Sequence, residues 1–186
     1  MIFEPKALPA QFLQSGQNET IKRISTARPL VSAVLRSTGF NRKELTSEID
    51  IDASPERVWS VLSDFDKFPE WNPFIREISG RTEKGEKLKV TLHPSGGRSI
   101  KMSPTILAAE PGKELRWIGH LGIPGLFDGQ HIFELKPSEG GKTTFVQREL
   151  FGGLLLPFLT GMLRNDTARG FGEMNKALKE RAEKPA

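Results

Sequence analysis

The 186-residue sequence contains no cysteine and no tyrosine. The lack of cysteine excludes disulfide bonds, cysteine-based metal sites and a cysteine nucleophile, and it fits a reducing compartment, so we expect a cytoplasmic location. The lack of tyrosine excludes acid–base catalysis by a phenol. No apolar run approaches the roughly 20 residues that a membrane-spanning helix needs. The run over residues 152–163 is short and is interrupted by Pro157.

A strong charge of one sign is also missing, because 27 Lys and Arg oppose 23 Asp and Glu, for a formal net charge of +4. Lys84, Lys87, Lys89 and Arg98 lie near one another in the sequence, but no aromatic residues are interleaved with them. Nucleic-acid binding requires a clustered basic surface. We therefore expect no nucleic-acid partner and interpret these residues as a solvated strand face.

Residues 1–41 show no clear helix or strand pattern. Residues 19–35 could form a helix up to Arg28 and a second one from Pro29, and no apolar core follows a basic start as in a secretory signal. The length of the chain favours one domain plus an extension. We predict a partly helical or poorly ordered N-terminal extension over residues 1–41 and a single domain over residues 42–183.

The domain begins with a clear strand and helix. Apolar alternation over residues 44–52 predicts a half-buried strand. Ser54 and Pro55 then suit the N-cap and the first position of a helix. Residues 64–73 have turn and short-helix character, and Pro69 and Pro73 limit any longer helix there. The inward face of the strand comprises Leu45, Ser47, Ile49 and Ile51, and the buried stripe of the helix comprises Val58, Trp59 and Leu62.

Several antiparallel strands and one long helix complete the chain. Alternation predicts strands over residues 74–80, 87–93, 100–109 and 114–121, and in the third of these Met102, Pro104, Ile106 and Ala108 share a face. Residues 154–183 predict a long amphipathic helix. Its apolar stripe comprises Phe158, Met162, Leu163, Phe171, Met174 and Leu178.

Two apolar segments should meet at one end of the domain. The loop over residues 122–127 is unusually apolar, and so is the start of the last helix, residues 154–159. Together they could form a gate for a hydrophobic ligand. A dry contact between loop and helix, or a dimer patch, is the structural alternative, so a homodimer is possible.

The sharpest chemical feature lies in the predicted hairpin over residues 127–151. If the loop over residues 137–142 closes it, Leu135 pairs with Phe145, Phe133 with Gln147, and His131 with Glu149. Extending the alternation to the preceding strand places Trp117 beside His131. A histidine and a carboxylate then lie on an otherwise apolar inward face.

This arrangement has three interpretations. A carboxylate accepting a hydrogen bond from one ring nitrogen of His131 would orient the imidazole, whose other nitrogen could bind a ligand hydroxyl or carbonyl. Alternatively, His131 and Glu149 form a catalytic pair with histidine as general base, or a purely structural cross-strand pair. His93 and His120 point outward by alternation, so we predict no metal site.

The segments IDIDASPERVWSVLSDFDKFPEWNPF, AAEPGKELRWIG, HIFELKP, GGKTTFVQRE and GFGEMNKALKERAE give the chain a family resemblance. Over residues 42–183 it resembles the START/Bet v 1-like (SRPBCC) superfamily, in its polyketide cyclase/dehydrase-type branch. The resemblance implies an α+β helix-grip fold: a curved antiparallel sheet wrapped around a long C-terminal helix, with two short helices after the first strand and a ligand cavity between sheet and helix.

The expected function is binding of a small hydrophobic molecule, lipid-like or aromatic, in that cavity. The alternatives are a cyclase or dehydratase without metal, with His131 as base, Glu149 as its orienter and Gln147 as carbonyl partner, and a protein-interaction module. We expect no cofactor. The predicted catalytic residues are His131 and Glu149, and the predicted ligand-binding residues are Trp117, His131, Glu149, Gln147, Phe133, Met102, Ile106, Trp71, Leu159 and Met162.

Overall fold

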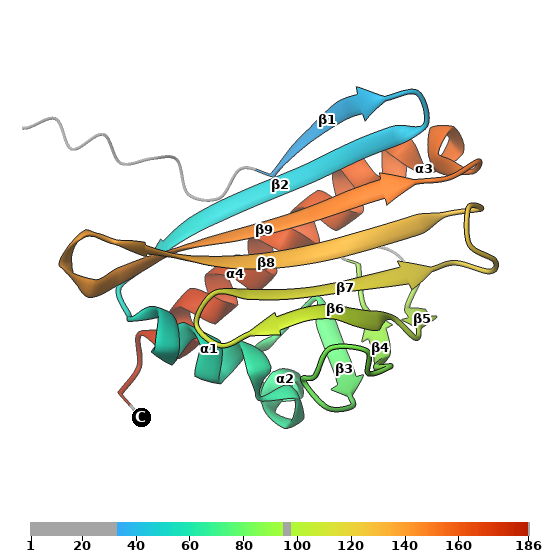
Figure 1. Ribbon diagram of the computed structural model, residues 1–186. Helices are drawn as coiled ribbons and strands as arrows, with labels where there is room; N and C mark the ends of the chain where they lie inside the picture. Colours follow the sequence, from blue (N-terminus) through green and yellow to red (C-terminus); the bar gives the residue numbers. More distant parts are fainter. Residues whose placement is uncertain (1–32, 95–97, 186) are drawn as a thin grey trace, which may run out of the picture.

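A six-stranded antiparallel sheet dominates the computed structural model, which describes residues 33–94 and 98–185. The strand order is β1-β2-β9-β8-β7-β6, so the hairpin β8–β9 lies at the centre (Figure 1). Neighbouring strands pair antiparallel, including β2 and β9, which are far apart in the sequence. The strands are β1 (Val34–Gly39), β2 (Arg42–Ile51), β6 (Thr105–Glu110), β7 (Glu114–His120), β8 (Asp128–Ser138) and β9 (Lys142–Gly152).

A smaller three-stranded sheet adjoins the main one. Its order is β3 (Ile75–Ser79), β4 (Lys89–Leu92) and β5 (Ile100–Met102). The segment before β4 links the two sheets, because the Leu88 amide donates to the carbonyl of Pro104 at 2.8 Å and the Ile106 amide donates to the carbonyl of Glu86 at 2.9 Å.

Short helical segments follow β2, as the sequence predicts. They are α1 (Pro55–Ser63), a 3-10 turn η1 (Phe65–Lys67) and α2 (Phe68–Trp71). Ser54 is the N-cap of α1, and its hydroxyl accepts a hydrogen bond from the Arg57 amide at 3.3 Å. That bond satisfies one of the amides that the first turn of a helix leaves without a partner.

The C-terminal helical segment lies across the inner face of the main sheet (Figure 1). It is built from α3 (Leu156–Met162), a π-helical turn η3 (Leu163–Thr167) and α4 (Ala168–Ala182), which follow one another without a gap and correspond to the predicted long helix over residues 154–183. Phe171, Met174 and Leu178 are buried in the core, but Phe158 is 84% exposed, so its prediction as part of the buried stripe is wrong. Among the described residues, no helix is both long enough and apolar enough to cross a membrane.

Two details of the predicted strands also require correction. The predicted strand over residues 100–109 is two strands, β5 and β6, that belong to different sheets. A bulge between Ile106 and Ala108 then places Ala109 opposite the inward-facing Leu115, and Ala108 opposite Arg116. Ala108 therefore does not share the face of Ile106, because a bulge shifts the alternation by one residue.

The N-terminal edge of the sheet was not predicted either. Strand β1, within the predicted extension of residues 1–41, pairs with β2 from Val34 opposite Thr46 to Gly39 opposite Arg42. The helix suggested from residue 19 to Arg28 lies outside the described residues.

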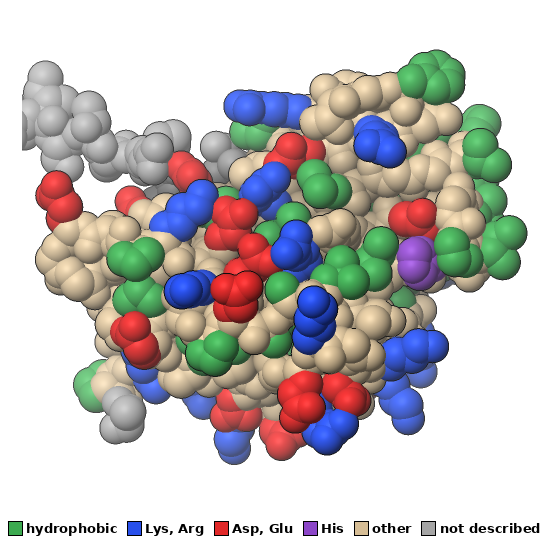
Figure 2. All heavy atoms as spheres, viewed as in Figure 1, with side chains coloured by type: hydrophobic (Ala, Val, Ile, Leu, Met, Phe, Trp, Pro, Cys, Tyr) green, Lys and Arg blue, Asp and Glu red, His purple; other side chains and the backbone are tan. Residues whose placement is uncertain are grey.

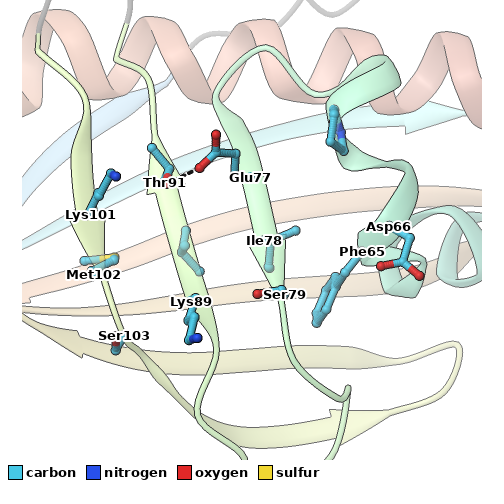
Figure 3. A pocket seen from close by; sticks show the side chains of 12 residues that line it. Phe65, Asp66, Glu77, Ile78, Ser79, Lys89, Thr91, Lys101, Met102 and Ser103 are labelled. Atoms are coloured by element: carbon cyan, nitrogen blue, oxygen red, sulfur yellow. Dashed lines mark hydrogen bonds between the residues drawn. The ribbon is translucent and has the colours of Figure 1, made fainter.

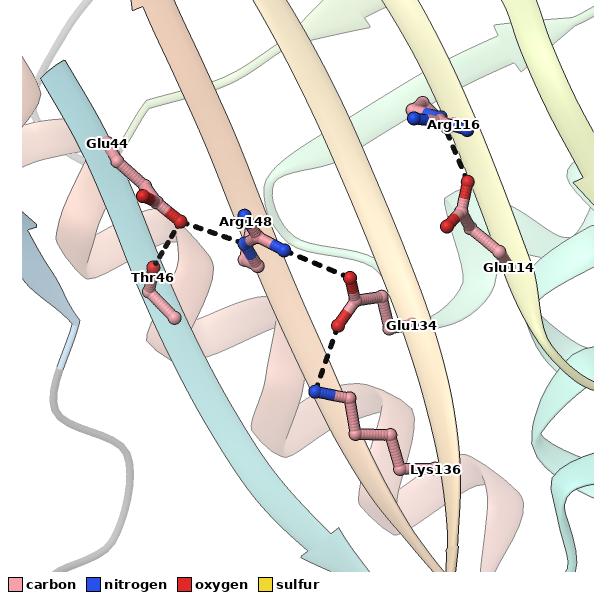
Figure 4. A network of polar contacts seen from close by, with 7 residues as sticks. All are labelled: Glu44, Thr46, Glu114, Arg116, Glu134, Lys136 and Arg148. Carbon is pink, nitrogen blue, oxygen red and sulfur yellow. Dashed lines mark hydrogen bonds and ion pairs between the residues drawn. The ribbon is translucent and has the colours of Figure 1, made fainter. Parts of the chain in front are cut away.

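The outer face of the main sheet carries a polar network across three strands (Figure 4). Arg148 on β9 donates to Glu44 on β2 at 2.8 Å and to Glu134 on β8 at 3.0 Å. Lys136 lies 3.0 Å from the second oxygen of Glu134. Arg148, Glu44 and Glu134 are half-buried and Lys136 is exposed. All four face away from α4, so the inner face remains apolar apart from a few buried polar groups. Those groups form the candidate site.

Candidate functional site: a buried polar row between sheet and helix

The strand register places the predicted residues as the sequence indicates. Trp117 on β7 lies opposite His131 on β8, and His131 lies opposite Glu149 on β9. The pairing of Phe133 with Gln147 is confirmed as well. All five side chains belong to the inner face of the sheet, because residues two apart along a strand share a face.

His131 is enclosed by aromatic rings and is only 4% exposed. Its ring stacks on Phe133 with centroids 4.2 Å apart and on Phe171 of α4 at 4.9 Å, and the Trp117 ring meets it edge-on at 5.4 Å. Burial disfavours the charged imidazolium and lowers the pKa of His131 from 6.5 to about 3. His131 is therefore neutral and weakly basic at neutral pH.

The hydrogen-bond partner of His131 is Gln147 rather than Glu149. The Gln147 amide nitrogen lies 2.9 Å from His131 Nε2 and 3.5 Å from the sulfur of Met174 on α4. With that amide donating, Nε2 is the unprotonated acceptor and the ring proton is on Nδ1. The predicted orienting role of Glu149 is thus held by Gln147 in this structure.

Glu149 turns toward the neighbouring strand, over Gly129 of β8. A Cβ atom at position 129 would lie 2.6 Å from Glu149 Oε1, so the carboxyl group uses the space that this glycine leaves free. Among the described residues, it has no hydrogen-bond or ion-pair partner. Burial raises the pKa of Glu149 from 4.5 to about 8. The carboxyl group is therefore mostly protonated at neutral pH and can donate a hydrogen bond.

We call His131, Gln147 and Glu149 the buried polar row. The row continues toward β2 and α4 through Ser47 and Asn175, two residues that the sequence analysis did not select as site residues. Asn175, fully buried, donates from Nδ2 to Ser47 Oγ on β2 at 3.0 Å. Ser47 in turn lies opposite Gln147. The signals were present in the sequence, since Ser47 lies on the inward face of its strand and Asn175 follows Met174 of the apolar stripe.

Two buried acceptors in this row lack a partner among the described residues: Oε1 of Gln147 and Oδ1 of Asn175. Burying an amide oxygen without a hydrogen bond costs about 1–3 kcal/mol. Such groups are uncommon in folded proteins, where buried polar atoms are usually paired. The row therefore combines buried polar groups and a half-buried Glu149 with no net charge at neutral pH and unused hydrogen-bonding capacity.

The other predicted ligand-binding residues are Ile106, Leu159, Met102, Met162 and Trp71, and they come from different elements of the fold. Ile106 is 1% exposed and lies opposite Trp117, and Leu159 is half-buried on α3. Met102 extends over Gly119 of β7, where a Cβ atom would lie 2.9 Å from its terminal methyl. The side chain of Met162 lies outside what the structure describes.

Trp71 is placed elsewhere. Its ring packs edge-on against Phe68 at 4.9 Å, and it lines a pocket of about 350 Å³ together with Arg57 and Arg181. The structure does not bring Trp71 to the buried polar row.

An open pocket of about 680 Å³ lies over the small sheet and η1 (Figure 3). Ile78, Val90 and Met102 supply apolar surface, and Lys89 and Lys101 line it with their charged side chains. Met102 is its only member from the predicted ligand-binding set, so this pocket is distinct from the buried polar row. Within the described residues no cluster of three metal-ligating side chains occurs.

Comparisons with known proteins agree with this architecture. A family model described as polyketide cyclase / dehydrase and lipid transport matches residues 42–183. A search of curated proteins found no match to this sequence.

Solved structures share the fold at low sequence identity. The Zhui aromatase/cyclase from Streptomyces sp. R1128 superposes with a TM-score of 0.64 at 13% identity, over 76% of this chain and 94% of that one. A START superfamily protein from Mycobacterium smegmatis gives a TM-score of 0.61 at 21% identity, over 75% and 97%.

The di-domain ARO/CYC protein BexL gives a TM-score of 0.63 at 13% identity over 78% of this chain, which spans only 52% of BexL. At such identities, the likenesses show the α+β helix-grip fold, and with it the predicted fold class is confirmed.

Proposed function

Because the chain belongs to the polyketide cyclase/dehydrase and lipid transport family, we propose that it binds a small hydrophobic molecule, lipid-like or aromatic, between the main sheet and the C-terminal helical segment. The observation that carries this proposal is the buried polar row, in which Gln147 Oε1 and the Glu149 carboxyl group have no partner within the described chain. A ligand that carries one polar group on an apolar body would satisfy these atoms. Ligand sites commonly combine apolar walls with a few such placed polar groups.

The charge state of the row selects the ligand class. His131 and Glu149 are both predominantly neutral at pH 7, because burial lowers the pKa of the first to about 3 and raises that of the second to about 8. A charged ligand group would be left without a counter-ion in this apolar surrounding, at a large desolvation cost. We therefore infer that the ligand presents an uncharged hydroxyl or carbonyl group.

Two glycines that face each other across neighbouring strands support a position for the proposed ligand. Gly119 and Gly129 face each other across β7 and β8, and the side chains of Met102 and Glu149 extend over them. Both side chains are flexible and unbranched, so rotation about their bonds could make room for a ligand. The proposed ligand position is therefore above these glycines, with Trp117 and His131 beside it.

Catalysis of a cyclisation or dehydration is the second candidate, and the observation that favours it is the raised pKa of Glu149. A general acid or base is most effective when its pKa lies near the working pH. Glu149, with a pKa of about 8, meets this condition, whereas His131, with a pKa of about 3, is a poor base. In this candidate mechanism Glu149 transfers the proton, and Gln147 and His131 orient the substrate.

The test begins with native mass spectrometry of the purified protein, followed by denaturing extraction of any bound molecule. Titration with the extracted compound, or with a panel of apolar alcohols, phenols and ketones, is then followed by tryptophan fluorescence. Trp117 contacts the row, so a Trp117→Phe variant should lose most of the fluorescence response while it retains binding.

Substitutions separate the two candidates. For a carrier, Gln147→Leu should weaken binding of hydroxyl-bearing compounds more than that of their hydrocarbon analogues, and no compound should be converted. For a catalyst, Glu149→Gln should keep binding and lose turnover, and the exposed turn variant Glu139→Gln should retain both. If no compound copurifies and the panel does not bind, the proposal is refuted and a protein-interaction role becomes the better explanation.

A further inference from the structure

Large hydrophobic side chains are exposed at one end of the molecule. Among the described residues, seven large hydrophobic side chains are exposed, and six of them lie in the turns and helix at this end. We call these six residues the apolar rim: Phe40 (97% exposed), Leu121 (43%), Ile123 (70%), Leu154 (70%), Leu155 (36%) and Phe158 (84%).

The rim is assembled from three separate segments of the chain. The loop after β7 and the segment after β9 are bonded together, because the Leu154 amide donates to the Gly125 carbonyl at 3.1 Å and the Leu155 amide donates to the Leu126 carbonyl at 3.0 Å. Residue 40 follows β1, whose hairpin with β2 ends beside the end of β9, where Arg42 pairs with Gly152. The ends of β1 and β9 and α3 lie close together in Figure 1, and hydrophobic side chains gather along this end in Figure 2.

The orientation of α3 exposes the rim rather than burying it. Leu156 at the start of α3 is fully buried, whereas Phe158, two residues later, projects outward. Gly153, with φ of 117°, brings the backbone so close to Leu126 that a Cβ atom at that position would lie 2.5 Å from the Leu126 carbonyl oxygen. The loop and the helix are thus held together, and their hydrophobic residues remain in solvent. Grouped exposed hydrophobic residues are typical of interaction surfaces.

Unpaired cations adjoin the rim. Arg36 and Arg42 are exposed on the β1–β2 hairpin, and Arg164 is exposed on η3, which packs beside β1. None of the three has an ion-pair partner among the residues that the structure describes.

Acidic groups at the same end are already engaged. Asp128 Oδ1 lies 2.7 Å from His120 Nδ1 and Asp128 accepts from the Gly125 amide, and Asp166 contacts Arg169 at 3.5 Å. The free charge beside the rim is therefore positive, which complements an anionic partner.

We propose that the apolar rim binds the surface of a lipid bilayer that contains anionic lipids. Phe40, Ile123 and Phe158 enter the boundary between headgroups and acyl chains, and the three arginines contact anionic headgroups. Apolar side chains combined with cations are the two terms that hold a peripheral protein at a membrane. The inference does not depend on the proposed ligand. It would place Leu159, a half-buried residue of the predicted ligand-binding set, next to the bilayer.

The experiment is vesicle co-sedimentation of the full chain. Vesicles of phosphatidylcholine alone are compared with vesicles of phosphatidylcholine and phosphatidylserine, at low and high salt. We expect binding to the mixed vesicles, weakened by salt because exposed charges are screened. Phe158→Ser should lower the partition coefficient about tenfold, from the transfer free energy of a phenylalanine side chain. Arg42→Gln should lower it about fivefold on anionic vesicles alone.

Val34→Ser is the matched control, since Val34 is an exposed hydrophobic residue (42%) at the opposite end of β1 from Phe40 and should leave binding unchanged. Lack of binding to the mixed vesicles, or binding that Phe158→Ser does not weaken, overturns the proposal. Size-exclusion chromatography provides a further check: a dimer that Phe158→Ser converts to a monomer would assign the rim to a second copy instead. Ligand titration of the same variants, followed through Trp117, keeps a failure of this proposal distinct from a failure of the proposed function.

Discussion

Replacing Glu149 with glutamine should change how the stability of the protein depends on pH. Burial raises the pKa of Glu149 from 4.5 to about 8, so the folded chain holds more protons than the unfolded chain between those pH values. The stability contributed by the protonated carboxyl group is therefore lost as the pH rises through this window. Glutamine keeps nearly the same shape and a hydrogen-bond donor but does not ionise.

His131 acts in the opposite direction at lower pH. Burial lowers its pKa from 6.5 to about 3, so the unfolded chain binds more protons between these values, and stability increases as the pH rises from 3 to 6.5. Above pH 6.5 the contribution of His131 is nearly constant, and Glu149 dominates. Other titrating groups are common to both proteins, so the difference between them isolates Glu149.

The magnitude follows from the two pKa values. One unit of pKa difference corresponds to about 1.4 kcal/mol. Between pH 6 and pH 9 the wild-type protein should lose about 2–3 kcal/mol of unfolding free energy relative to Glu149→Gln. Urea denaturation at pH 6, 7, 8 and 9 measures this difference directly.

The exposed carboxylate variant Glu139→Gln is the control and should follow the wild-type profile. Parallel profiles for wild type and Glu149→Gln would show that Glu149 is charged in the folded protein at neutral pH. That result would remove both the neutral polar row and the candidate role of Glu149 as a proton donor.

Two further predictions concern glycines. Gly170→Ala should destabilise the protein by about 1–3 kcal/mol, because a Cβ atom there would overlap the buried Phe74 ring. Gly161→Ala is the control: the site has open space around it, so the substitution should be neutral or stabilising by up to about 1 kcal/mol. Thermal denaturation measures both changes. Gly129→Ala should push the Glu149 carboxyl group toward solvent and flatten the alkaline part of the pH profile. Gly152→Ala, which meets no atom within 4 Å, should leave the profile unchanged, and equal effects of these two substitutions would contradict the placement of Glu149.

Strand register was predictable because alternation is a strict local rule. The pairs His131–Glu149, Phe133–Gln147 and Trp117–His131 follow from side-chain periodicity once the hairpin turn is located, and all three are present. Alternation could not predict which polar side chains bond to each other. Glu149 on β9 turns away from His131 because Gly129 on the neighbouring strand β8 has no side chain. The direction of the Glu149 side chain therefore depends on a residue of another strand, which alternation within β9 cannot predict.

The errors occur where the regular period of an element changes. Phe158 was assigned to the buried stripe on the assumption of 3.6 residues per turn throughout the helix. The π-helical turn at Leu163–Thr167 has a wider period, so the apolar faces before and after it no longer align. The bulge after Ile106 shifts the face of the following strand residues in the same way. Neither irregularity has a local sequence pattern that identifies it.

The two ends of the C-terminal helical segment are held very differently. At the far end of α4, Arg57 donates to the Ala182 carbonyl at 3.3 Å, Glu183 accepts from the Asp52 amide at 2.7 Å, and Lys179 donates to the Asp50 carbonyl at 2.7 Å. Arg181 adds an ion pair with Glu70 at 2.9 Å.

These contacts fix the C-terminal end of α4 to β2 and to the short helices that follow it. The start of α3 is attached to a different part of the fold, the loop after β7, and the π-helical turn at Leu163–Thr167 separates it from α4. Any widening of the space beside Glu149 would therefore move α3 together with the loop after β7, while the C-terminal end of α4 and the central hairpin keep their positions.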